Sequence, residues 1–113
     1  MFKLSDKTSY TWPVKYRVPD GGKYADVEFT AEFKRLTSSR LEQLARDAGE
    51  GKVNDDTFIA EVLLGWSGIK TAAGEEFEYS AGNRDLLLDT FPGLRYAVVT
   101  AFQESIAGAV RKN

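Results

Sequence analysis

Two alternating runs of apolar residues, separated by a pair of glycines, constrain the fold of this chain more than any other feature. Apolar side chains occupy every second position in residues 10–18 and again, with the opposite parity, in residues 25–33. Gly21-Gly22 lies between the runs, and glycine adopts the positive φ angles that a two-residue hairpin turn requires. A turn there sets each apolar residue opposite another, whereas a slip of one residue would expose one of the two sets. The predicted pairs are Asp20 with Lys23, Tyr16 with Val27, Val14 with Phe29 and Trp12 with Ala31.

The sequence therefore predicts an antiparallel hairpin over about residues 10–36, with one apolar and one polar face. The polar face carries Lys15 and Arg17 on one strand opposite Asp26 and Glu28 on the other. Opposite charges across neighbouring strands attract weakly, and we interpret this face as a solvated surface.

The remaining chain, about residues 39–111, has the apolar spacing of helices. Ser39 followed by Glu42 matches a capping box, in which the two side chains satisfy backbone donors at a helix start. Proline suits the first turn of a helix, so we expect the final helix to begin at Pro92. The other predicted helix starts are Asn54 or Asp55, and Ser80.

The second of these helices is expected to continue through the string VLLGW and to end at Gly65 or Gly68. Trp66 would then be a structural anchor on its apolar face. After a short linker, Phe77 and Tyr79 alternate like a small extended segment. The predicted apolar face comprises Phe58, Ile59, Val62, Leu63 and Trp66.

These elements place the chain in the α+β class. We expect a hairpin or small antiparallel sheet packed against about four C-terminal helices. A length of 113 residues leaves no room for a second core, so residues 1–113 are predicted to form a single domain.

The composition argues against several kinds of function. The chain contains neither cysteine nor histidine, which excludes disulfides, thiolate metal sites and Ser-His-Asp or Cys-His catalysis. The net charge is −2 and the pI is about 5.2, which disfavours a protein that coats nucleic acid. We therefore predict no enzymatic activity, no cofactor, no metal and no nucleic-acid partner.

Three acidic pairs are the remaining candidates for metal binding or acid–base catalysis. Only one pair has the i, i+4 spacing that places both carboxylates on one helix face. Two carboxylates alone are a poor metal site, because calcium takes six to eight oxygen ligands. We interpret the pairs as caps and surface charges. They are Asp55 with Asp56, Glu75 with Glu76, and Asp85 with Asp89.

Nothing in the sequence predicts export or membrane insertion. The N-terminal residues lack the apolar stretch of a signal peptide, and no run approaches the roughly 20 apolar residues of a transmembrane helix. We expect a cytoplasmic protein with no membrane partner. Phe2 and Leu4 suggest a further short strand before the hairpin.

The order of motifs over roughly residues 25–105 resembles the tail assembly chaperone family of long, non-contractile-tailed (lambda-like) phages and prophages. The most specific part is a Gly-Trp-x-Gly string, followed by a glycine turn and a serine-capped, leucine-rich helix before a proline. Ser67 stands where the family pattern has an acidic residue, and Glu76 where it often has proline. The matching residues are Phe29, Ala31, Phe33, Arg35, Leu36, Val62, Leu63, Gly65, Trp66, Gly68, Gly74, Phe77, Ser80, Leu87, Leu88, Pro92, Ala101 and Phe102.

The resemblance implies a non-catalytic protein that binds the tape measure protein in the infected cell and keeps it soluble. It also implies a longer form, made by ribosomal frameshifting, that recruits the tail tube protein. Neither form would remain in the mature virion. The alternatives are a small structural protein of the phage particle, such as a tail-completion or connector subunit, and a generic bacterial protein-interaction module.

A protein that holds a partner needs exposed apolar surface. Several apolar residues fall opposite the main apolar faces of the predicted second and final helices, and we take them as candidate contacts for a partner or for a weak homo-oligomer. An unpaired strand edge of the hairpin is a second route to self-association. The candidate residues are Tyr96, Val99, Val110, Ala60 and Leu64.

Overall fold

A three-stranded antiparallel sheet forms the base of the fold. The structure is a computed structural model that describes residues 3–4 and 6–111. Strands β1 (Ser9–Asp20) and β2 (Lys23–Lys34) form a long hairpin, and the short strand β3 (Leu63–Ser67) pairs with β2, so the strand order is β1-β2-β3.

The register of the hairpin is the predicted one. Asp20 pairs with Lys23, and the apolar pairs follow along both strands to Trp12 and Ala31. Gly21 and Gly22 both have positive φ, at 60° and 83°, as a type I′ turn requires. Val14, Phe29, Ala31 and Phe33 are buried on one face, whereas Arg17 and Asp26 form an exposed ion pair of 3.1 Å on the other.

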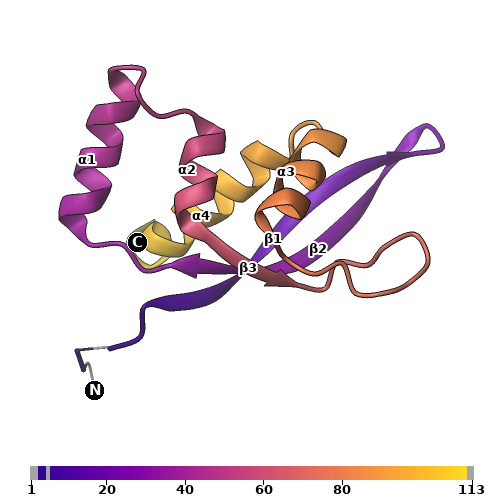
Figure 1. The fold of residues 1–113 in the computed structure, drawn as a ribbon, viewed down its shortest axis with the longest axis horizontal. Helices are drawn as coiled ribbons and strands as arrows, with labels where there is room; N and C mark the ends of the chain where they lie inside the picture. Colours follow the sequence, from indigo (N-terminus) through magenta and orange to yellow (C-terminus); the bar gives the residue numbers. More distant parts are fainter. Residues whose placement is uncertain (1–2, 5, 112–113) are drawn as a thin grey trace.

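Four helices complete the α+β fold and lie on the apolar side of the sheet (Figure 1). They are α1 (Ser38–Gly49), α2 (Asp55–Val62), α3 (Ala81–Thr90) and α4 (Leu94–Arg111). Helix α4 packs on β1, and α2 packs between α4 and the strands β2 and β3. Helix α1 stands at the far end of the molecule, away from the tip of the hairpin (Figure 1).

Two predicted helix caps are confirmed and two predicted starts are wrong. Asn54 and Ser80 accept hydrogen bonds from the backbone N–H groups three residues later, at 2.9 and 3.0 Å. Helix α1 is capped by Thr37 instead of Ser39, because the Thr37 hydroxyl already accepts from the Arg40 N–H. Helix α4 begins at Leu94, two residues after Pro92.

The predicted second helix is too long, because residues 63–67 form β3. The boundary between the two elements lies inside the apolar run 62–66, and a short apolar run fits a buried strand as well as a helix. In the strand, Trp66 pairs with Ala31 and Gly65 with Glu32. Gly65 gives the Glu32 side chain room, since a Cβ there would lie 3.1 Å from a Glu32 carboxylate oxygen.

The predicted extended segment at Phe77 and Tyr79 alternates as expected, with both rings half-buried and Glu78 exposed, although it belongs to no named strand. The Phe77 N–H donates to the Ile69 carbonyl at 2.9 Å, next to an isolated bridge between Lys70 and Glu76. The further strand predicted before the hairpin is not confirmed. Leu4 is fully exposed and lies outside any strand. Phe2 lies outside the described residues.

One hydrophobic cluster joins the sheet to α2, α3 and α4. At its centre the rings of Phe33 and Phe102 meet edge to face, with centroids 5.3 Å apart. The buried members of this cluster are Val14, Phe29, Ala31, Phe33, Ile59, Val62, Leu63, Leu88, Leu94, Val98, Ala101 and Phe102.

Among the residues described, no helix is both long and apolar enough to cross a membrane.

We predict that Trp66→Ala destabilises the fold by about 3–5 kcal/mol. The Trp66 indole stacks on Phe77, meets the rings of Phe29 and Tyr79 edge to face, and donates from Nε1 to the Phe77 carbonyl at 2.7 Å. Trp66→Phe keeps an aromatic ring and loses this hydrogen bond, so we expect a smaller loss. Urea unfolding measures both, and an unchanged midpoint for Trp66→Ala would show that the side chain is not an anchor.

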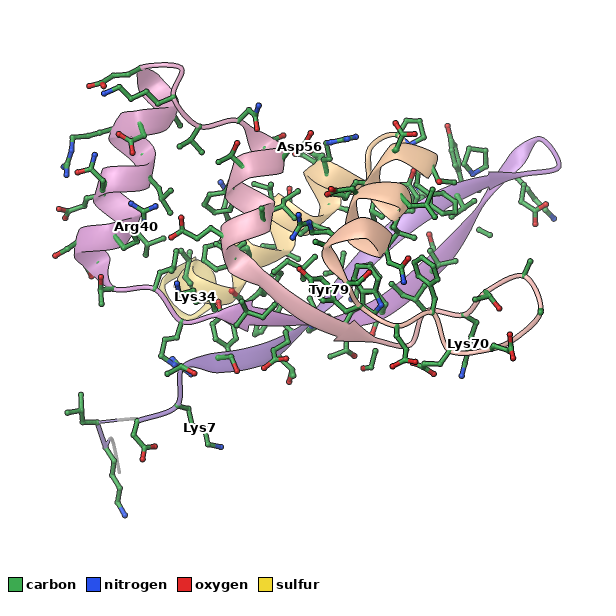
Figure 2. All side chains as sticks on the ribbon, in the orientation of Figure 1. Lys7, Lys34, Arg40, Asp56, Lys70 and Tyr79 are labelled. Atoms are coloured by element: carbon green, nitrogen blue, oxygen red, sulfur yellow. The ribbon has the colours of Figure 1, made fainter. Side chains whose placement is uncertain are left out.

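We predict that Glu61 supports stability in a pH-dependent way. Arg40 points from α1 toward α2 (Figure 2) and donates two hydrogen bonds to the Glu61 carboxylate, at 2.7 and 2.5 Å. These bonds lower the pKa of Glu61. A lowered folded-state pKa contributes stability above the ordinary glutamate pKa of about 4.3, and this contribution is lost as the pH falls through the folded-state value. Between about pH 6 and pH 3, Glu61→Gln should therefore lose less stability than the unaltered protein.

The control is Glu42→Gln, which neutralises an exposed carboxylate on α1. Thermal unfolding at a series of pH values compares the three proteins. Equal losses of stability on acidification in Glu61→Gln and in the unaltered protein would contradict the role given to the ion pair.

Candidate functional site

The outer half of the hairpin extends beyond the third strand. Strand β3 ends at Ser67, opposite Thr30, and Gly68 then turns the chain away from β2 with a φ of 88°. The part of the hairpin from Tyr16 to Phe29, which we call the arm, therefore has only two strands. The arm passes α3 and the loop that follows β3 (Figure 1).

A hollow of about 730 Å³ lies against this arm. Its walls are the arm, the loop 68–72 and helix α3, and we call it the arm groove. Apolar side chains at its surface are open to solvent: Val27 is 44% exposed and Leu86 is 55% exposed. The residues that line it are Tyr16, Val18, Pro19, Asp20, Ala25, Val27, Glu28, Phe29, Gly68, Ile69, Lys70, Thr71, Ala72, Phe77, Leu86, Leu87, Thr90, Phe91 and Leu94.

Specific contacts hold the inner wall of the groove in place. The Tyr16 hydroxyl donates to the Pro92 carbonyl at 2.5 Å, and its ring meets Phe91 edge to face. These contacts fix the arm to the junction of α3 and α4. The groove therefore exists before any partner binds.

The loop wall has its own internal support. The Thr71 N–H donates to the Glu75 carbonyl at 2.7 Å, and the Gly74 N–H donates to the Thr71 carbonyl at 2.9 Å. Lys70, on the same loop (Figure 2), donates to Glu76 at 2.9 Å and lowers its pKa. The loop is thus a closed turn that keeps its shape beside the arm.

The residues predicted from the sequence as contact candidates do not form one patch. Tyr96 is 74% exposed on α4 and lines a separate hollow beside β1. Val99 is partly buried and lines another hollow beneath α1. Ala60 is exposed on α2, and Leu64 is 42% exposed on β3 instead of a helix. Val110 belongs to α4, and its side chain lies outside the described residues.

The sequence did not predict the arm groove, although the alternating pattern of the hairpin predicts one of its walls. The alternation of the hairpin placed Val18, Ala25 and Val27 on an apolar face. That pattern does not say whether a helix covers the face, because coverage depends on where distant elements end. Gly68, read as a helix terminator, is the residue that opens the groove.

The acidic pairs mostly serve as caps and ion-pair partners. Asp55 and Asp56 lie in the first turn of α2, and Asp56 also accepts a hydrogen bond from Arg95. Asp85 pairs with Arg84 at 3.2 Å. Within residues 3–4 and 6–111, no three acidic side chains come together as a metal site would require.

Comparison with known families decides the identity. The model of one protein family, described as phage tail assembly chaperone, matches residues 1–113, the whole chain. The chain belongs to the phage tail assembly chaperone family. Neither a curated protein nor a solved structure gives a significant match.

Membership of this family gives the arm groove a context. A tail assembly chaperone acts on other phage tail proteins, so a surface that contacts a protein is expected, and the family suggests a role without catalysis. The arm groove is an apolar, solvent-open and preformed surface of this kind.

Proposed function

We propose that this chaperone binds the tape measure protein through the arm groove and keeps it soluble until the tail assembles. The observation that carries the proposal is an open apolar groove on a chain of the tail assembly chaperone family. Burial of one exposed aliphatic side chain contributes about 1.5–3 kcal/mol. Val27 and Leu86 are each about half exposed, so covering them supplies part of this energy, and the other apolar residues of the groove add contact area.

The proposal includes the cellular setting. The chaperone acts in the host cytoplasm without enzymatic activity, cofactor or metal, and it is absent from the mature virion. A frameshift-extended form carries an additional segment that recruits the tail tube protein. A frameshift near the end of the reading frame leaves the arm groove unchanged, because all of its lining residues lie between Tyr16 and Leu94.

We predict that Leu86→Asp weakens binding of the tape measure protein at least about tenfold, because it places a charge among the apolar side chains of the groove. The matched control is Ile106→Asp on α4. Ile106 is 49% exposed, close to the 55% of Leu86, and lies outside the arm groove. Co-expression with the tape measure protein, followed by co-purification and titration, measures both variants. If both variants bind as tightly as the unaltered protein, the groove is not the binding surface.

We also propose that the chaperone self-associates weakly through α4. Many copies are needed along a long partner, and Tyr96 presents a large exposed ring on this helix. The outer edge of β1 is less suitable for pairing, since it contains Pro13 and Pro19 and proline cannot donate to a neighbouring strand.

We predict a concentration-dependent oligomer that Tyr96→Asp weakens. Analytical ultracentrifugation over about a hundredfold concentration range is the measurement, because mass action shifts a weak equilibrium over such a range. Tyr24→Asp is the control, as Tyr24 is 64% exposed but lies on the arm. A protein that stays monomeric throughout would overturn the proposal.

A further inference from the structure

One edge of the arm has backbone groups without a partner strand. In a hairpin closed by a two-residue turn, the pair next to the turn exchanges both backbone hydrogen bonds, and bonded and non-bonded pairs then alternate. The register makes Ala25 and Val27 members of bonded pairs with β1. The backbone N–H and C=O groups of Tyr24, Asp26 and Glu28 therefore point the other way, and we call them the arm edge.

Strand β3 shows what this side of β2 can bind. Thr30, two residues after Glu28, pairs with Ser67 of β3 on the same side. Beyond that pair the chain leaves β2 at Gly68. Among the described residues, no strand pairs with the arm edge and no loop backbone bonds to it.

The opposite edge of the hairpin differs in one respect. By the same alternation, the outward positions of β1 include Pro13 and Pro19, and neither can donate a hydrogen bond. Proline on an edge strand is a common protection against unwanted strand pairing. The arm edge contains no proline, so only this edge keeps its full set of donors.

The arm groove reaches the arm edge. Its lining includes both Val27 and Glu28, whose side chains lie on opposite faces of the strand, as expected of a hollow that extends along the edge. The facing wall is the loop 68–72. The hollow thus occupies the place where a longer β3 would have continued.

The charges beside the arm edge indicate what kind of segment fits. On the polar face, basic residues of β1 lie opposite acidic residues of β2: Arg17 opposite Asp26, and Lys15 opposite Glu28. Glu28 has no ion pair among the described residues. A strand on the other side of β2 gains attraction from basic residues on this face and buries apolar residues on the groove face beside Val27.

We propose that the arm edge binds an extended segment of the partner protein as a fourth strand, with alternating apolar and basic residues. Main-chain hydrogen bonds supply affinity in strand addition, and alternate side chains supply specificity. The identity of the partner as the tape measure protein rests on the proposed function, whereas the mode of binding rests on the register, the groove and the charges described above.

The test removes one donor from the arm edge. Glu28→Pro deletes an outward N–H at a position equivalent to those that prolines already occupy in β1. Glu28→Ala is the matched control for the lost charge, and Lys15→Pro is the control for a proline on the other edge. The probes are the tape measure protein and overlapping peptides of about ten residues that cover it, the upper length of an ordinary strand.

We expect Glu28→Pro to bind about tenfold more weakly and Glu28→Ala to lose less than about fivefold. Lys15→Pro should bind like the unaltered protein. Circular dichroism checks that each variant folds. If Glu28→Pro does not fold, amide hydrogen exchange of the unaltered protein gives the answer, since a bound strand protects the N–H groups of Tyr24, Asp26 and Glu28.

The outcomes separate the two proposals. No binding of the tape measure protein to the unaltered chaperone contradicts the proposed function. Binding that leaves the three amides unprotected, or that Glu28→Pro and Glu28→Ala weaken equally, overturns strand addition alone. If these amides become protected from exchange when the concentration of the chaperone alone is raised, without a partner, the occupant is a second copy. That result overturns the proposal as well.

Discussion

The pairing of β1 with β2 in one register is the constraint on which the remaining structure depends. The positive φ angles of Gly21 and Gly22 fix the turn, and the turn fixes which residues face each other. As a result Val14, Phe29 and Phe33 lie on one face, and α4 and α2 have a continuous apolar surface on which to pack. A register shifted by one residue would leave the helices without a core.

The sequence predicts the elements whose signals are local. The hairpin follows from alternation and a glycine turn, and the caps at Asn54 and Ser80 follow from a side-chain oxygen that is close in sequence to the backbone donors it satisfies. Thr37 shows the limit of this reasoning: three consecutive hydroxyl residues, Thr37, Ser38 and Ser39, stand at one helix start, and the first of them forms the cap. The local sequence identifies the few residues that can cap a helix, but it does not show which of them forms the cap.

The sequence does not predict features that depend on distant partners. The apolar run 62–66 divides between α2 and β3 because β2 offers an edge to Trp66 and its neighbours. The arm groove is also non-local, since it exists only where β3 stops and α3 does not cover the arm. The exposed residues Tyr96 and Leu64 could be found from helix faces and apolar runs, but their separation on the surface could not.

The two prolines of β1 have a consequence for growth of the sheet. Pro13 and Pro19 deprive the outer edge of β1 of donors, and at the other side of the sheet the Tyr79 hydroxyl already donates to the Leu63 carbonyl of β3. The outer edges of β1 and β3 are therefore poorly equipped to pair with the arm edge of another copy, which hinders head-to-tail addition of one copy to the next. Such one-sidedness lets a protein accumulate to high concentration with an exposed strand edge and still avoid runaway fibre formation.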